Sequence, residues 1–154
     1  MLSRTSEYAL SALILLTQRE KDWPIPGRDI AHETGVPQKY LSKILGDLVR
    51  VGVLEANRGK SGGFRLARSA RKIRLHEALL PFERFEERRC PFGNKECSND
   101  EPCLAHNEWK HVIETFQRFL QSTSVADVAI KEGDKKARKP RRQSCVPLSV
   151  SKRV

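Results

Sequence analysis

The chain has 154 residues, of which 38% are hydrophobic and 31% are charged. This length suffices for one domain with a modest core, or for a small domain with an appendage, and it excludes most large enzyme scaffolds. Lysine and arginine outnumber aspartate and glutamate by 29 to 19, a net charge of +10, so an anionic partner such as nucleic acid is the first expectation. The charge falls in three zones, +7 over 1–75, −4 over 76–130 and +7 over 131–154.

No part of the sequence has the length and apolar character of a membrane-spanning helix. The longest uninterrupted apolar run, residues 12–16, is far shorter than the roughly 20 residues that cross a bilayer. The N-terminus also lacks the successive basic, apolar and small-residue sections of a signal peptide. We therefore expect a cytoplasmic protein with no membrane partner.

The first fifty residues predict three helices. Apolar residues recur at three-to-four spacing over 4–18, the pattern of an amphipathic helix, and the two prolines of 22–27 end this pattern. A second short helix is predicted over 28–34 and a third over 37–51, whose leading proline suits a first helical turn. Gly35 suits the left-handed turn between them. Two short helices joined in this way are a helix-turn-helix candidate.

A short hairpin is predicted after the third helix. Residues 53–56 and 64–67 have the character of two strands, and the connecting segment 57–63 contains three glycines that permit a tight turn. Arg58 and Lys60 make this turn basic. A basic, glycine-rich turn is by itself usually only solvated. Its position directly after a helix-turn-helix instead predicts the wing of a winged helix.

The second half of the chain begins with a short helix predicted over 75–85. Residues 86–102 predict a polar loop that holds the cysteine cluster. A long helix is predicted from about Ala105. Its apolar stripe consists of Trp109, Val112, Ile113, Phe116, Phe119 and Leu120. We expect the stripe to form a dimer seam, and the alternative is that it packs on the first helix of the same chain.

The C-terminal residues predict a final turn and a tail. Ser124 and Asp127 have capping-box spacing. Beyond Lys131, nine cations, few large apolar residues and no periodicity predict a disordered basic tail, in which Cys145 is given no ligand role. The predicted fold is mainly α with a small β-hairpin wing. It comprises a winged helix-turn-helix DNA-binding domain over 1–75, a cluster-binding loop and dimerisation helix over 76–130, and the tail over 131–154.

Helix-turn-helix proteins place their second helix in the major groove of DNA, with its first turns against base edges. Glutamine and lysine there can hydrogen-bond adenine and guanine, while cations in a wing suit phosphates or a minor groove. The candidate contacts with double-stranded DNA are Gln38, Lys39, Tyr40, Ser42 and Lys43 in this helix, Arg58, Lys60 and Ser61 in the wing, and Ser3 and Arg4 at the start of the first helix. The alternative, ordinary solvated side chains, applies most to Ser3, Arg4 and Ser42.

Three cysteines lie within 14 residues. Six residues separate Cys90 from Cys97 and five separate Cys97 from Cys103, and His106 follows three positions later. In a reducing compartment such a cluster favours metal or redox chemistry over disulfides. The spacing is wider than that of most structural zinc sites, and thiolates from a polar loop fit an iron–sulfur cluster better. Three thiolates require a fourth ligand of another type. The remaining alternative is three reduced thiols with no metal.

These features together resemble the IscR, NsrR and RirA group of bacterial iron–sulfur transcription regulators, often called the Rrf-two family. The resemblance covers about residues 1–130. The matching residues are Tyr8-Ala9-Leu10, Ile30-Ala31, Val36-Pro37, Tyr40-Leu41, Val51-Gly52-Val53-Leu54, Arg58-Gly59, Gly62-Gly63-Phe64-Arg65-Leu66-Ala67 and the three cysteines. The resemblance implies a homodimeric winged-helix repressor or activator. Its cluster, held between the winged domain and the long helix, would control operator binding.

The resemblance also implies a ligand set. Cys90, Cys97 and Cys103 match the cluster cysteines of the family. His106 lies where IscR-like members have a histidine, and Glu7 lies where NsrR-like members have a carboxylate that reaches the partner subunit's cluster. We favour His106 over Glu7. Because members of the family differ in this ligand, both a 2Fe–2S and a 4Fe–4S cluster are compatible with the sequence.

The sequence therefore predicts a dimeric DNA-binding regulator whose cluster senses redox state, nitric oxide or iron status. The alternatives are a zinc- or thiol-based DNA-binding regulator without a cluster, and an iron–sulfur electron carrier, which would not need the basic wing. An enzyme is not expected. His32, His76 and His111 have no evident serine or cysteine nucleophile, and no phosphate-cradling glycine loop begins a helix.

Overall fold

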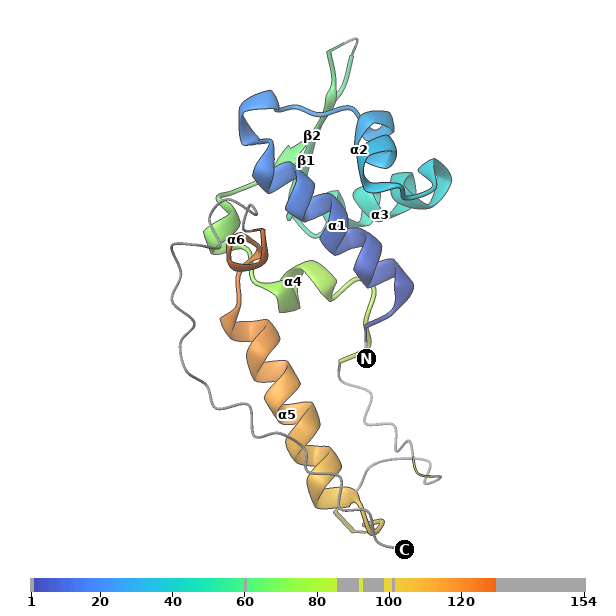
Figure 1. The fold of residues 1–154 in the computed structure, drawn as a ribbon, viewed down its shortest axis with the longest axis vertical. Coiled ribbons are helices and arrows are strands. Elements are labelled where there is room, and N and C mark those ends of the chain that lie inside the picture. Colours follow the sequence, from blue (N-terminus) through green and yellow to red (C-terminus); the bar gives the residue numbers. More distant parts are fainter. Residues whose placement is uncertain (1, 60, 86–91, 93–98, 101, 130–154) are drawn as a thin grey trace, which may run out of the picture.

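The computed structural model describes residues 2–59, 61–85, 92, 99–100 and 102–129. Its elements in chain order are α1 (Arg4–Gln18), the 3₁₀ turn η1 (Glu20–Asp22), α2 (Gly27–Thr34), α3 (Gln38–Arg50), β1 (Leu54–Asn57), β2 (Gly63–Leu66), the 3₁₀ turn η2 (Ala70–Lys72), α4 (Leu75–Leu79), α5 (His106–Ser122) and α6 (Val125–Val128). Helices α1 to α3 and the hairpin gather at one end of the molecule, and α5 projects from the other end (Figure 1).

Helix α1 has the bounds that its apolar periodicity predicts. It begins after Ser3, whose Oγ accepts a hydrogen bond from the backbone N–H of Ser6 at 3.2 Å and so caps the helix. The side chains that face the core are fully buried, namely Ala9, Ala12, Leu13 and Leu16. Their three-to-four spacing places them along one stripe, which explains why this segment is helical in contact with the rest of the fold.

Helices α2 and α3 form the predicted helix-turn-helix. Gly35 ends α2 with a φ of 69°, a left-handed conformation that glycine adopts without a steric penalty. Pro37 directly precedes α3, where its missing N–H leaves no helical hydrogen bond unmade. The buried side of α3, which faces α1 and α2, consists of Leu41, Ile44, Leu45 and Leu48.

An isolated antiparallel β-bridge lies beside the two-stranded hairpin. Strands β1 and β2 pair antiparallel with Asn57 opposite Gly63, each shifted by one residue from its predicted bounds. Ile25 then exchanges two backbone hydrogen bonds with Phe64, at 3.0 and 2.8 Å. A Cβ on Gly63 would lie 2.5 Å from the backbone of Ile25, so only glycine allows this approach. From the sequence alone, residues 22–27 are predicted only as a break between helices.

Helix α4 is shorter than predicted. It ends at Leu79, whereas the prediction continued the helix to residue 85. Pro81 accounts for the difference, because a proline lacks the backbone N–H that would continue the helical hydrogen bonds. After this proline, Phe82 and Phe85 still pack against the core as part of an irregular segment.

The C-terminal end of α5 returns the chain to the winged part of the molecule. The N–H of Leu75 donates to the carbonyl of Thr123, and the N–H of Val125 donates to the carbonyl of Ile73, both at 2.9 Å. The predicted capping box over residues 124–127 is present at the start of α6. Helix α6 packs on α1, so the first and the last helix of the described chain are in contact.

The apolar stripe of α5 is covered at one end and open along one edge. Leu120 is fully buried and Phe116 is partly buried against the core, where α5 packs on α4. Val112 and Phe119 are 43% and 48% exposed. None of the helices in the described ranges is long and apolar enough to cross a membrane.

Several predicted features lie outside the described residues. They are Lys60 in the wing, Cys90 and Cys97 of the cysteine cluster, and the tail over 131–154 with Cys145.

Candidate nucleic-acid interface and metal site

Helix α3 carries an exposed polar face on the side opposite its buried face. The five residues predicted to contact DNA here are all exposed, namely Gln38, Lys39, Tyr40, Ser42 and Lys43. Tyr40 is 66% exposed, although aromatic side chains usually bury most of their surface. The hydroxyl of Ser42 donates to the carbonyl of Gln38 at 2.9 Å, so this hydrogen is already used within the helix. The first two turns of α3 thus offer amide, phenol and ammonium groups to a ligand.

The wing presents Arg58 and Ser61 to solvent. At its base, Arg65 Nη2 lies 2.6 Å from Glu55 Oε2 across the two strands. This cross-strand pair neutralises the charge of Arg65, whereas Arg58 lies beyond it, in the turn that projects from the winged part (Figure 1). The position suits a contact with a polyanion.

The start of α1 is held by a residue that the sequence analysis did not single out. Oε1 of Glu83 accepts hydrogen bonds from the Ser3 backbone N–H at 2.5 Å and from the Ser6 hydroxyl at 2.6 Å. Ser3, predicted to contact DNA, therefore has a capping role in the structure. Arg4 lies next to it, paired with Glu7 at 3.1 Å and stacked over Tyr8 at 5.2 Å.

Two opposing effects set the pKa of Glu83. Burial disfavours its charged form, but the hydrogen bonds from Ser6 and Ser3 outweigh burial and lower the pKa below its usual range. An ionised carboxylate is also favourable at this position because the N-terminus of a helix carries partial positive charge. No sequence signal indicates this contact, which joins residues 80 positions apart.

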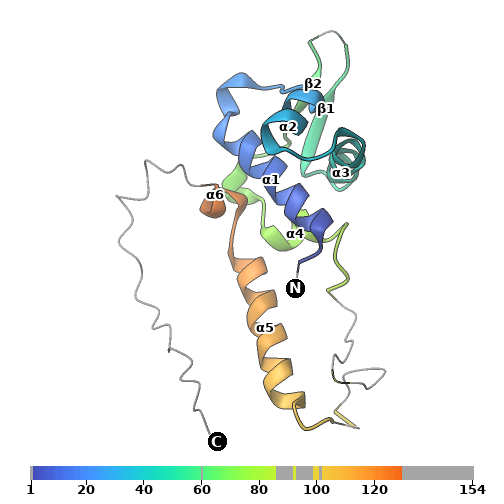
Figure 2. The same ribbon diagram turned by 45° about the vertical axis from the view of Figure 1, so that its right-hand side comes forward.

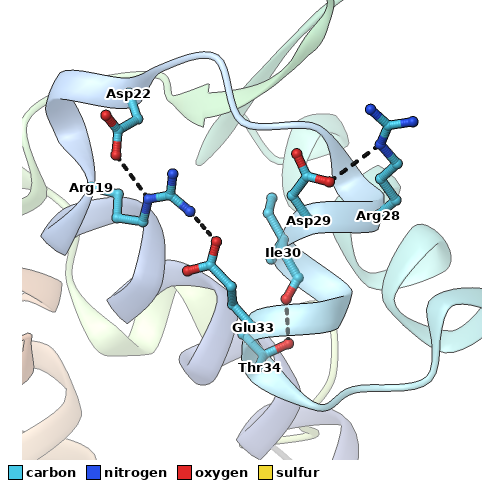
Figure 3. Close-up of polar contacts among 7 residues, drawn as sticks. All are labelled: Arg19, Asp22, Arg28, Asp29, Ile30, Glu33 and Thr34. Carbon is cyan, nitrogen blue, oxygen red and sulfur yellow. Dashed lines mark hydrogen bonds and ion pairs between the residues drawn. The ribbon is translucent and has the colours of Figure 1, made fainter.

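A surface ion-pair network fixes α2 against the end of α1 (Figure 3). Nε of Arg19 donates to Asp22 Oδ2 at 2.8 Å, and its guanidinium also contacts the carboxylate of Glu33 in α2. Arg19 therefore joins α1, η1 and α2 on one side of the helix-turn-helix. On the other side of this view, Arg28 pairs with its neighbour Asp29 at 3.2 Å.

Two of the predicted metal ligands, Cys103 and His106, lie three residues apart at the start of α5. The backbone N–H of His106 donates to the carbonyl of Cys103 at 3.0 Å. The His106 side chain is buried, and its Nε2 lies 3.0 Å from Asn99 Oδ1. Within the described ranges, no three histidine, cysteine or acidic residues are grouped closely enough to hold a metal ion.

Glu7, the other candidate for the fourth ligand, lies on α1 and is exposed. In both views the start of α1 lies far from the start of α5, where Cys103 and His106 lie (Figures 1 and 2). Within one chain, Glu7 is therefore separated from Cys103. A shared site would require Glu7 to come from a second subunit.

The comparisons with known proteins agree with this arrangement. Residues 2–131 match the family model described as "Rrf2: Iron-dependent Transcriptional regulator". The chain is 28% identical over 163 residues to the HTH-type transcriptional regulator IscR of Xenorhabdus nematophila, with 99% of each chain covered.

Two solved structures share the fold. IscR of T. potens has a TM-score of 0.69 at 22% identity, with 90% of this chain and 91% of that chain covered. CymR, the global cysteine regulator of B. subtilis, has a TM-score of 0.70 at 22% identity, with 84% and 95% covered. These likenesses confirm the predicted winged-helix fold, and the family match confirms a transcriptional regulator in place of an enzyme. The chain therefore belongs to the Rrf2 family of transcriptional regulators.

Proposed function

We propose that this regulator binds operator DNA as a dimer and that an iron–sulfur cluster controls the binding. The observation that carries the DNA-binding part is the exposed polar face of α3 beside a projecting basic wing. In this arrangement Gln38 and Lys43 read base edges, while Arg58 contacts the DNA backbone. The remaining proposed DNA contacts are Lys39, Tyr40, Ser42, Ser61, Lys60 and Arg4. We place the regulator in the cytoplasm.

The cluster part of the proposal rests on donor chemistry. Cys103 and His106 lie three residues apart at the start of α5, and thiolate sulfur with imidazole nitrogen is a donor set that iron–sulfur clusters accept. Cys90 and Cys97 supply the other two thiolates in this proposal. To ligate through Nε2, His106 would exchange its contact with Asn99 for the metal. A bound cluster would supply a group that responds to redox state, nitric oxide or iron supply.

The fourth ligand has two candidates with different geometric demands. His106 belongs to the same chain as Cys103 and lies one helical turn from it. Glu7 of the partner subunit would instead have to exchange its ion pair with Arg4 for the metal. We favour His106, because it requires no movement of α1 and its side chain is already buried, three residues after Cys103.

The proposed dimer forms along the open edge of α5. Val112 and Phe119 are seven residues apart and lie on one side of the helix, where water now contacts almost half of each side chain. Apolar surface of this kind is stabilised when a second copy covers it. A dimer would also place two copies of α3 against two half-sites of an operator.

Glu83 connects the cysteine region to the DNA-binding region in this proposal. It follows α4 in the chain, seven residues before Cys90, and its carboxylate holds the start of α1. The far end of α5 is fixed to the winged part through residues 123–125. A ligand that changes the path of the chain between these two anchors would therefore act on the orientation of the winged part.

A second candidate function is a thiol- or zinc-based regulator without a cluster. The structural likeness to CymR, described as a cysteine regulator, favours this candidate because that likeness is as strong as the likeness to IscR. In this case the same α3 and wing would bind DNA. The cysteines would then act as free thiols or as zinc ligands.

Anaerobic purification followed by visible absorption, iron and sulfide analysis distinguishes the two candidates. The wild-type protein is compared with Cys97→Ala and with the matched control Cys145→Ala. We expect a coloured wild type and control with stoichiometric sulfide, and a colourless Cys97→Ala variant. A colourless wild type that contains zinc or no metal would contradict the cluster and leave the DNA-binding proposal in place.

Operator binding is tested on duplexes selected from a random pool by the wild-type protein. The affinity of the cluster-containing and cluster-free forms is then measured on the same duplex over a range of salt concentrations. We expect the two forms to differ in affinity. Equal affinities at every salt concentration would refute control by the cluster.

A further inference from the structure

The exposed face of α3 continues beyond the two turns that the sequence analysis singled out. Lys39, Lys43, Gly46 and Arg50 recur at spacings of four, three and four residues. With 3.6 residues per turn they fall within an arc of about 60°. This arc lies opposite the buried side of α3, and all four positions are exposed. A glycine therefore interrupts a row of three cations.

Nothing in the described part of the chain accounts for a glycine at position 46. It lies inside α3, where its φ is not positive, and a Cβ built there meets no atom within 4 Å. The fold would thus accept a side chain at this position. A glycine inside an exposed helix lowers the stability of that helix relative to alanine. Gly46 therefore weakens the helix, and no contact within the described residues compensates for this loss.

The neighbouring cation is held along the same face. Arg50 Nη1 lies 3.0 Å from Asp47 Oδ1, and the Arg50 side chain is 77% exposed. The ion pair directs the guanidinium along the helix surface and leaves further N–H donors for an anion. Lys43 on one side of Gly46 and Arg50 on the other thus flank a strip of bare helix backbone.

We propose that Gly46 lets the sugar-phosphate backbone of DNA approach α3 closely, between Lys43 and Arg50. This inference rests on the proposed docking of α3 in a DNA groove, and it adds Gly46 and Arg50 to the interface. Two flanking cations attract a strand of phosphates, and the missing side chain removes the atoms that would hold that strand away from the helix. The cost in helix stability is offset only when DNA is bound.

The test separates stability from affinity with Gly46→Ala and Gly46→Gln. Both replacements favour a helix, so urea unfolding should show stability equal to or above that of the wild type. On the selected duplex, affinity should fall by about 5- to 100-fold, more for glutamine than for alanine, because the contact becomes overpacked. Glu114→Gln, on the exposed polar side of α5, is the control and should leave affinity unchanged.

The outcomes also separate this inference from the proposed function. Wild-type affinity in Gly46→Gln, together with weakened binding in Lys43→Ala, would overturn the inference and leave α3 as the DNA-binding helix. Wild-type affinity in both variants would overturn the docking of α3 and the inference with it. A clear loss of stability in Gly46→Ala would show that the fold itself needs the glycine, which also contradicts the inference.

Discussion

At the start of α1, one carboxylate from a distant part of the chain organises several residues. Glu83 accepts hydrogen bonds from the Ser3 backbone and from the Ser6 hydroxyl, which is fully buried. Ser3 at the same time caps α1 through its own side chain. The position of Arg4, a candidate DNA contact, therefore depends on a residue outside the winged helix-turn-helix segment.

Replacement of Glu83 by glutamine should destabilise the fold. The isosteric amide keeps the shape but loses the charge that both donors face, and hydrogen bonds to charged groups are the stronger ones. We expect a decrease of about 1–2 kcal/mol in the free energy of unfolding, measured by urea denaturation. Glu20→Gln, at an exposed site in η1, is the matched control and should change it by less than about 0.5 kcal/mol.

Because of Glu83, we expect the free energy of unfolding to depend on pH. The pKa of Glu83 is lowered in the folded chain, chiefly by hydrogen bonds that overcome its burial. A lowered pKa means that the ionised form stabilises the fold above the pKa of an unfolded glutamate, and that this contribution is lost as the pH falls through the folded-state value. The stability difference between wild type and Glu83→Gln should be constant above about pH 6 and shrink towards pH 3. A difference that grows on acidification would contradict this sign.

At the scale of single elements, α3 and the wing would have different tasks in the proposed complex with DNA. The exposed face of α3 combines groups that can distinguish bases, whereas the wing offers Arg58 at the end of a narrow hairpin. Base contacts give sequence preference, and phosphate contacts give affinity that falls with added salt. The two elements should therefore respond differently to the loss of a cation.

Lys43→Ala and Arg58→Ala test this division. We expect Lys43→Ala to reduce discrimination between the selected duplex and random DNA by about 1–3 kcal/mol. Arg58→Ala should weaken binding to both duplexes alike and reduce the slope of log affinity against log salt by about 1. Titrations by fluorescence anisotropy at several salt concentrations measure both quantities. Equal losses on both duplexes for Lys43→Ala would make it a phosphate contact.

At the scale of the whole molecule, α5 contacts the rest of the described fold chiefly at its C-terminal end. Its C-terminal end is buried against α4 and fixed by backbone hydrogen bonds of residues 123–125, while the helix projects away from the winged part (Figure 2). Val112 and Phe119 remain open along one edge. A second copy that covers this edge would complete the burial of the stripe.

Phe119→Asp should therefore prevent dimer formation. A carboxylate in the middle of an apolar interface would be buried without a partner, which is strongly unfavourable. Lys110 is exposed and lies nine residues away, about half a rotation around the helix, so Lys110→Asp is the matched control. Sedimentation at micromolar concentration should show a monomer for the first variant and a dimer for the control. A dimeric Phe119→Asp protein would contradict the proposed seam.

Local sequence patterns predicted the elements and the exposed face of α3. The bounds of α1 follow from apolar spacing, and the turn between α2 and α3 follows from Gly35, because both depend on residues close in sequence. The same holds for the capping box of α6 and for the pairing of β1 with β2. The α4 prediction was too long because Pro81 cannot donate the backbone hydrogen bond that would continue the helix.

These local patterns did not predict the contacts between segments that are distant in sequence. The bond from Ser3 to Glu83, the pairing of Ile25 with Phe64 and the packing of α6 on α1 each join residues that share no local signal. Which of many polar groups meet is decided when the chain folds around one core, since burial brings segments together without regard to their separation in sequence. The sequence by itself thus determined the winged-helix elements and the chemistry they expose. Only the tertiary structure decided that Glu83 holds α1 and that one edge of α5 remains open for a partner.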